Sequence, residues 1–137
     1  MKASTYLLNG LDSDNTVNKN ESFKLLSKFH SVQAPTYQDI SILTRICKIV
    51  AIRSASLTCA AIAAMVEQQG LHKQEDGHDI VIGINGSTYE FYPYMAERVH
   101  RSLRNWFGTE ISDRIRMEIA KDGGSIGGAL IAMLCNE

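Results

Sequence analysis

The sequence is poor in the residues that mark several common protein classes. Its 137 residues include 2 prolines and 3 cysteines, and only 7% are aromatic. The cysteines are widely spaced and form no CxxC pair, so the sequence predicts neither a disulfide framework nor a zinc site. Cys47, Cys59 and Cys135 stand in apolar helical contexts, and we expect all three to be buried and reduced in a cytoplasmic protein.

Neither a strong charge nor a targeting segment is evident. The net charge is −1, so the sequence lacks the basic excess typical of nucleic-acid binding. Arg98, Arg101 and Arg104 recur at helical spacing and predict a solvated face rather than a binding patch. The first ten residues lack a signal-peptide core, and the longest apolar stretch, 59–66, is too short to span a bilayer. The length suits one domain, residues 1–137, with no nucleic-acid or membrane partner.

A long helix is the largest expected element. Thr36 and Asp39 form a capping-box pattern, no proline or glycine follows up to Gln69, and Gly70 provides the stop. These residues predict about 50 Å of helix. Ile42, Ile46, Ile49 and Val50 give its first half an apolar stripe. Its second half, "LTCAAIAAMV", is apolar or small all round and predicts burial on every side. The remaining residues are too few to wrap it, so we expect this helix to associate with the rest of a larger fold or with itself.

The other elements are shorter. "LDSDNTVNKNES" predicts a loop, and residues 22–30 predict an amphipathic helix. "IVIGI" and "STYEFY" flank Asn85-Gly86, which predicts a β-hairpin with a type I′ turn. A helix is expected from Pro93 to about Phe107, with Gly108 as its stop, followed by a strand in "RIRMEIA". The last helix is expected over about 125–135, which gives the order α-α-β-β-α-β-α.

Four glycines crowd the start of that last helix. Gly123 and Gly124 can take positive φ in the turn, and Gly127 and Gly128 leave one side of the first helical turn without side chains. The unpaired N–H groups of a helix start attract anions and polar nucleotide atoms if the backbone can be approached. This motif alone leaves two interpretations open: the glycines form part of a nucleotide-binding site, or they allow the helix to pack closely on the sheet. The spacing matches neither a Walker A loop nor GxGxxG.

Several motifs together resemble the hexokinase family, and within it the fungal-type glucokinases. "INGSTYEFYP" resembles the family's DG turn followed by "EFYP" or "LHP". "DGGSIGGAL", residues 122–130, resembles "DGSGxGAAL", and "ILTRICKIVAIRSASLTCAAIAAMV" resembles the family's long helix. "TYLLNGLDSDNT" resembles the segment that precedes this helix, so the similarity covers essentially the whole chain.

The resemblance implies an α/β fold of the actin-like ATPase (RNase H-like) type, of which the chain is the C-terminal part of the large domain. It implies ATP-dependent phosphorylation of a hexose, glucose above all, at the first step of glycolysis. It also implies that the glycine turn borders the adenosine side of ATP. The matching positions are Gly123, Gly124, Ser125, Gly127, Gly128 and Thr5. Two departures stand out: the family's Ser-Gly is Gly124-Ser125, and its aspartate before the turn glycine is Asn85.

The groups that complete such a site are not among these residues. The family's phosphate loop, sugar-binding segment and catalytic aspartate lie upstream, and Mg²⁺ would be held by groups outside the chain. Asp14-Asn15-Thr16 follows the "TYLL" segment, so we do not interpret it as the catalytic motif. We therefore expect no catalytic residue, no metal site, a partial ATP site and no activity of the chain alone. A non-catalytic interaction module derived from a hexokinase is the alternative. An RNase H-like nuclease is disfavoured, since no acidic cluster follows the expected strands.

Overall fold

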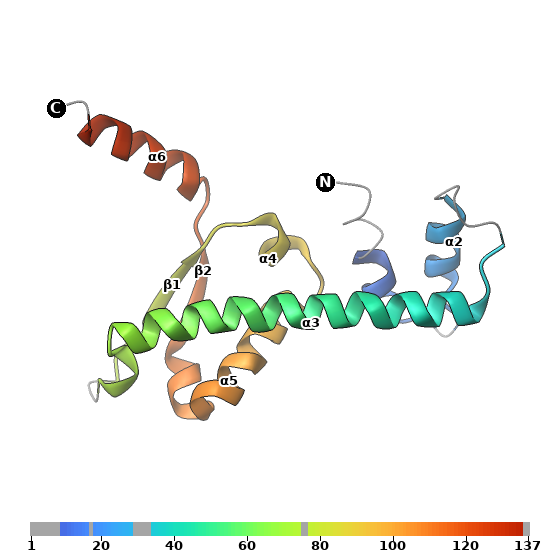
Figure 1. Ribbon diagram of the computed structural model, residues 1–137, viewed down its shortest axis with the longest axis horizontal. Helices are drawn as coiled ribbons and strands as arrows, with labels where there is room; N and C mark the ends of the chain where they lie inside the picture. Colours follow the sequence, from blue (N-terminus) through green and yellow to red (C-terminus); the bar gives the residue numbers. More distant parts are fainter. Residues whose placement is uncertain (1–8, 17, 29–33, 75–76, 136–137) are drawn as a thin grey trace. The chain divides into compact units, whose positions relative to one another are not determined.

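A computed structural model describes residues 9–16, 18–28, 34–74 and 77–135. Thr5 lies outside these ranges. The chain divides into two compact units, Met1–Ala55 and Ser56–Glu137. One helix, α3 (Tyr37–Gln68), passes from the first unit into the second (Figure 1).

The first unit is helical. Residues 9–13 form a helical segment, so the expected loop begins later than "LDSDN" suggested. A second helix, α2 (Asn20–Lys28), buries Leu26 in a core with Leu11, Ile40 and Cys47. The last two residues lie seven positions apart on α3, which places them on one side of that helix.

The ends of α3 confirm the prediction made for them. Asp39 Oδ2 accepts from the backbone N–H and the hydroxyl of Thr36 at 2.8 and 2.6 Å, while Thr36 Oγ1 accepts from the N–H of Asp39 at 3.2 Å. This reciprocal pair is a capping box. At the other end Gly70 has φ 68°, and its N–H donates to the carbonyl of Glu67. A glycine in the left-handed region terminates the helix there.

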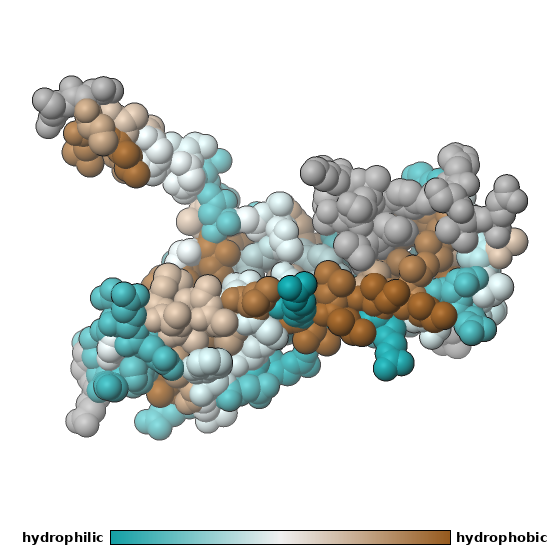
Figure 2. Space-filling model, viewed as in Figure 1, coloured by the Kyte–Doolittle hydropathy of each residue, from teal (hydrophilic) through white to brown (hydrophobic). Residues whose placement is uncertain are grey.

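The burial of α3 is one-sided throughout. Its buried positions are Ile40, Cys47, Ala51, Ala55, Cys59, Ile62, Ala63 and Val66. The expected apolar stripe of the first half is instead exposed, with Ile42, Ile46, Ile49 and Val50 each about half accessible. The second half also leaves Leu57 and Met65 exposed, so it is not buried on every side in these units. Figure 2 shows hydrophobic residues gathered along the exposed part of this helix.

By length and composition, α3 could also cross a membrane. It contains a strongly apolar stretch of 18 residues, of which 33% is buried. The 59–66 stretch considered from the sequence is thus part of a longer apolar segment. The core helix of a soluble protein meets the same criteria, and the absence of a membrane partner stays a prediction.

The second unit contains a parallel two-stranded sheet rather than a hairpin. Strand β1 (Ile80–Ile84) pairs with β2 (Ile115–Ile119) in the register Ile80 to Ile115 and Ile84 to Ile119. A short 3₁₀ turn, η1 (Leu71–Lys73), precedes β1. The "RIRMEIA" strand is therefore confirmed, and its partner is a strand distant in the sequence.

The expected second strand of the hairpin was wrong. Ser87–Phe91 forms a short helix, α4. Gly86 has φ 157° and ψ 129°, and Asn85 does not have positive φ, so the pair does not make the type I′ turn that requires positive φ at both positions. The order over the main elements is α-α-β-α-α-β-α. The segment between the strands crosses over from one parallel strand to the next, as such pairing demands.

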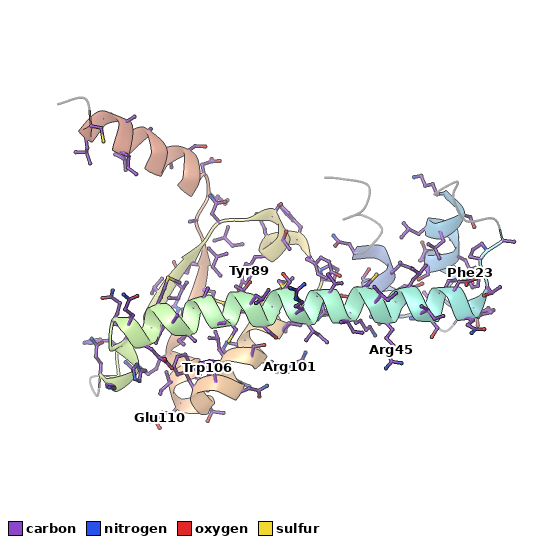
Figure 3. The ribbon with its side chains drawn as sticks, viewed as in Figure 1. Phe23, Arg45, Tyr89, Arg101, Trp106 and Glu110 are labelled. Carbon is purple, nitrogen blue, oxygen red and sulfur yellow. The ribbon has the colours of Figure 1, made fainter. Side chains whose placement is uncertain are left out.

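Helix α5 (Met95–Arg114) fills most of this crossover and is interrupted at Gly108, which has φ 78° and ψ 178°. The predicted stop is thus confirmed, and a second helical stretch follows it. Met95, Val99 and Leu103 are buried along α5. Trp106 Nε1 donates to Glu67 Oε1 at 2.9 Å, which joins α5 to the end of α3 (Figure 3).

The prediction made for the three cysteines has a mixed outcome. Cys47 and Cys59 are buried free thiols as expected, but Cys135 is exposed, so its predicted burial was wrong. It follows directly on α6 (Gly123–Leu134), none of whose residues, all of them described, is buried. Burial raises the pKa of the Cys59 thiol and also that of Cys47, where Asp12 adds to the effect.

Candidate nucleotide site

The predicted site lies where both strands end. Because β1 and β2 are parallel, their carboxyl ends lie at the same edge of the sheet. A short loop and a helix start follow each strand, at α4 and at α6. The N–H of Ala120 donates to the carbonyl of Ile84 at 2.9 Å and extends the pairing to this edge. In open α/β sheets, ligands bind outside the carboxyl ends of the strands.

The turn before α6 differs from the expected one in detail. The residue with positive φ is Asp122, at 53°, whereas Gly123 and Gly124 already belong to the helix. These two glycines therefore do not take the positive φ that was open to them. An aspartate can occupy the left-handed region at a modest cost, which lets the helix begin two residues before Ser125.

The start of α6 presents free backbone donors. The first hydrogen bond of the helix runs from the N–H of Ile126 to the carbonyl of Asp122. The N–H groups of Gly123, Gly124 and Ser125 precede it, and the Asp122 side chain makes no capping hydrogen bond within the described residues. These three N–H donors and the positive end of the helix dipole thus all point out of the N-terminal end of α6.

The glycines differ in what surrounds them. A Cβ on Gly123 would lie 3.3 Å from Ala120 Cβ and 3.5 Å from Asn85 Nδ2. One on Gly124 would lie 3.8 Å from the same Asn85 atom. At Gly127 and Gly128 an added Cβ would meet no atom of the described chain within 4 Å, apart from the adjacent residues and the backbone of the helix itself. Close packing within this unit therefore explains the absence of a side chain at Gly123 but not at the other three glycines.

Asn85 is the residue whose place the sequence reasoning did not foresee. The sequence patterns placed it in a type I′ turn and marked it as a departure from the family's aspartate, whereas the structure brings its amide beside Gly123 and Gly124. The signal was available: a residue just after one parallel strand lies near the residues that follow the other. Ser125 is exposed at the same edge, and Thr5 lies outside the described residues.

Carboxylates do not gather at this edge. In the described ranges, no three histidine, cysteine, aspartate or glutamate side chains are grouped so that they could hold a metal ion. Asp14 belongs to the first unit, where its carboxylate accepts from Thr16 and from both the N–H and the hydroxyl of Ser22. These bonds give Asp14 a structural role in the first unit.

Comparison with known proteins adds a family to this geometry. The sequence model of a family described as "Hexokinase" matches residues 1–134. A glucokinase of Aspergillus niger is 32% identical over 136 residues, which cover 97% of this chain and 27% of the relative. "Hexokinase-2" of rice (Oryza sativa subsp. japonica) is 38% identical over 101 residues, and "Hexokinase-2" of Homo sapiens is 35% identical over 98. These cover 69% and 71% of this chain, and 20% and 10% of the relatives. The chain thus spans about a quarter or less of the length of these relatives.

Proposed function

The chain belongs to the hexokinase family, and from this we propose that it contributes the adenosine side of the ATP site in the phosphorylation of a hexose. The family implies an actin-like ATPase fold, and the parallel strands with helices after their carboxyl ends are consistent with it. The observation that carries the proposal is the uncapped start of α6, with Gly127 and Gly128 open to an approaching ligand.

The residues at the strand ends fit a nucleotide. The N–H groups of Gly123, Gly124 and Ser125 can donate to ribose or phosphate oxygens, and the glycines leave the backbone accessible. ATP would supply the phosphoryl group that is transferred to the sugar. We propose Thr5 as a further contact on the strength of the family motif alone.

Magnesium and the hexose belong to other parts of the site in this proposal. Phosphoryl transfer is mostly positioning and electrostatic stabilisation, with metal ions neutralising charge between the phosphates. The described carboxylates offer no cluster for such an ion. The sequence lacks the family's motifs for the phosphate loop, the sugar contacts and the catalytic aspartate, and on that basis we assign Mg²⁺, the general base and the sugar contacts to groups outside this chain. A cytoplasmic location and the absence of nucleic-acid or membrane partners are part of the same proposal.

A titration with fluorescently labelled ATP tests the glycine turn. Gly124→Val adds a branched side chain at a helical position where its Cβ meets only Asn85 Nδ2, at 3.8 Å. Valine and glycine are both poor helix formers, so stability should change little. We expect the variant to weaken ATP binding about tenfold or more, because the side chain blocks approach to the backbone donors.

Ala132→Val is the matched control, since it adds similar bulk to an exposed position later in α6. It should leave ATP binding unchanged. In a complete enzyme that carries this segment, Gly124→Val should raise the KM for ATP far more than the KM for the sugar. Equal binding by both variants, or equal rises in both KM values, would support the packing interpretation.

A non-catalytic interaction module is the second candidate. The observation that favours it is the apolar surface of α6, where Leu130, Ile131 and Met133 are each more than half exposed. A chain that binds no ATP but captures a defined protein partner through α6 would favour this alternative.

A further inference from the structure

A basic groove in the first unit is not used by the proposed function. It is formed by one face of α3 together with the residue just before α2, and it has a volume of about 580 Å³. The lining residues are Lys19, Tyr37, Ile40, Ser41, Thr44, Arg45 and Lys48. Their positions on α3 recur at three- and four-residue spacing, so they form a continuous strip along the helix.

The groove carries three positive charges, and no acidic side chain of the described residues lines it. Arg45 and Lys48 are exposed and form no ion pair with any described residue. Lys19 Nζ donates to the backbone carbonyl of Asp14, which is a neutral acceptor and leaves the ammonium charge uncompensated. The Asp14 carboxylate is already engaged by Thr16 and Ser22. Figure 3 shows the Arg45 side chain extending away from the α3 backbone.

Hydroxyl groups lie among these cations. Ser41 and Thr44 both line the groove, and Ser41 is exposed. Three cations with an adjacent hydroxyl donor match an anion that presents several oxygen acceptors, and guanidinium is suited to phosphate in particular.

We propose that this groove binds a small phosphorylated metabolite, with Arg45, Lys48 and Lys19 as its phosphate contacts. The volume suits a metabolite-sized ligand. Two or more phosphoryl groups fit three separated cations better than one does, so the preferred ligand carries a diphosphate or two phosphates. The exposed ring of Tyr37 offers a surface for the apolar part of such a molecule.

Calorimetric titration with inorganic pyrophosphate tests the groove. The 137-residue chain is fused to a soluble carrier protein, and the carrier alone serves as the blank. We expect pyrophosphate to bind and Arg45→Glu with Lys48→Glu to weaken binding about tenfold or more, since two charge-assisted contacts become repulsive. Arg45→Gln with Lys48→Gln should weaken it less, and circular dichroism should show that the helices of both variants are retained.

Arg53→Glu is the matched control, because Arg53 is an exposed basic residue on the same helix outside the groove. It should bind pyrophosphate like the unmodified chain, and so should Gly124→Val, which changes the candidate nucleotide site. Equal loss in Arg53→Glu would reveal a general charge effect and overturn the proposal. Loss in Gly124→Val alone would assign pyrophosphate to the glycine turn and overturn it as well.

A sedimentation assay with vesicles containing phosphatidylinositol bisphosphate tests whether the groove binds a lipid headgroup instead of a soluble ligand. Binding to pyrophosphate in solution supports the proposal. Binding only to the vesicles, or to neither probe, contradicts it.

Discussion

At the scale of single residues, Asp14 organises the loop before α2. Its side chain is 6% exposed and accepts four hydrogen bonds, from the N–H and hydroxyl groups of Thr16 and Ser22. Burial raises the pKa of this carboxyl, but the hydrogen bonds from Ser22 and Thr16 outweigh burial and hold the pKa well below its usual range. A carboxylate bound in this way stabilises the fold only while it stays ionised.

Asp14→Asn should therefore destabilise the first unit. The amide replaces one acceptor oxygen by a donor that faces other donors, which costs about 2–4 kcal/mol at pH 7. The loss is measured as a lower urea midpoint of the helical circular dichroism signal. Glu21→Gln, which removes only an exposed pair with Lys24, should cost roughly 0.5 kcal/mol or less.

The stability lost in Asp14→Asn should also depend on pH. The folded pKa of Asp14 lies below the unfolded value of about 3.9, so its stabilisation is complete above about pH 5 and declines as the pH falls below the unfolded pKa. The difference in stability between the unmodified chain and Asp14→Asn should thus be largest at pH 7 and shrink near pH 3. A difference that stays constant across this range would show that the charge of Asp14 does not matter.

At the scale of elements, the break in α5 allows the chain to turn back toward β2. Gly108 combines φ 78° with ψ 178°, a conformation that is essentially confined to glycine. After it, Ser112 is fully buried, and β2 follows directly on Arg114. Arg114 then bonds the carbonyls of His78 and Gln74, just before β1. The break therefore helps to bring the start of β2 beside the start of β1.

Gly108→Ala should destabilise the second unit by about 1–3 kcal/mol, because alanine is strained in this backbone conformation. Apart from the adjacent residues and the backbone of the helix itself, no atom of the described chain lies within 4 Å of the added Cβ, so the loss would come from backbone strain rather than from a clash. Thermal unfolding followed by Trp106 fluorescence is the measurement. Thr109→Ala at the next position is the control, and an equal loss in both variants would contradict this explanation.

At the scale of the whole molecule, much apolar surface is left uncovered. On α6 the exposed large residues are Ile126, Leu130, Ile131, Met133 and Leu134, and α3 adds Ile42, Ile46, Ile49, Val50 and Leu57. Figure 2 shows this hydrophobic surface on both helices. Exposed apolar surface of this kind promotes association.

We accordingly expect the isolated chain to oligomerise and to bind a hydrophobic dye. Light scattering after size-exclusion chromatography and dye fluorescence measure the two effects. Leu130→Lys together with Met133→Lys should reduce both, while Lys121→Gln, outside the apolar surface, should not. A monodisperse monomer that binds no dye would contradict the expectation and make the surface irrelevant to association.

The isolated chain is also expected to phosphorylate no glucose. It presents one wall of a nucleotide site at most, and the loss of base, phosphate loop and sugar contacts together should leave essentially no rate. A coupled assay with purified chain, glucose, ATP and Mg²⁺ provides the measurement, with a glucose-free reaction as the blank. Turnover that survives repurification would mean that the catalytic residues were misplaced, and Asp14 and Asp122 would be the first to replace.

The sequence by itself determined the features that depend on neighbouring residues. Thr36 and Asp39 start α3, Gly70 ends it and Gly108 interrupts α5, because capping and positive φ are properties of a few consecutive residues. The family was also evident from motifs spread along the chain. Of the candidate site, the glycine run at 123–128 could be located in this way, although which residue of the turn takes positive φ could not.

Tertiary structure decided what depends on distant partners. "STYEF" alternates like a strand, yet β1 pairs with β2 more than thirty residues away, which leaves Ser87–Phe91 free to form α4. The same parallel pairing brings Asn85 beside Gly123. Burial on α3 likewise follows the residues that pack against it rather than its own apolar stripe, so Ile46 is exposed while Cys47 is buried. Pairing and packing join residues far apart in the chain, and local sequence patterns do not specify which ones will meet.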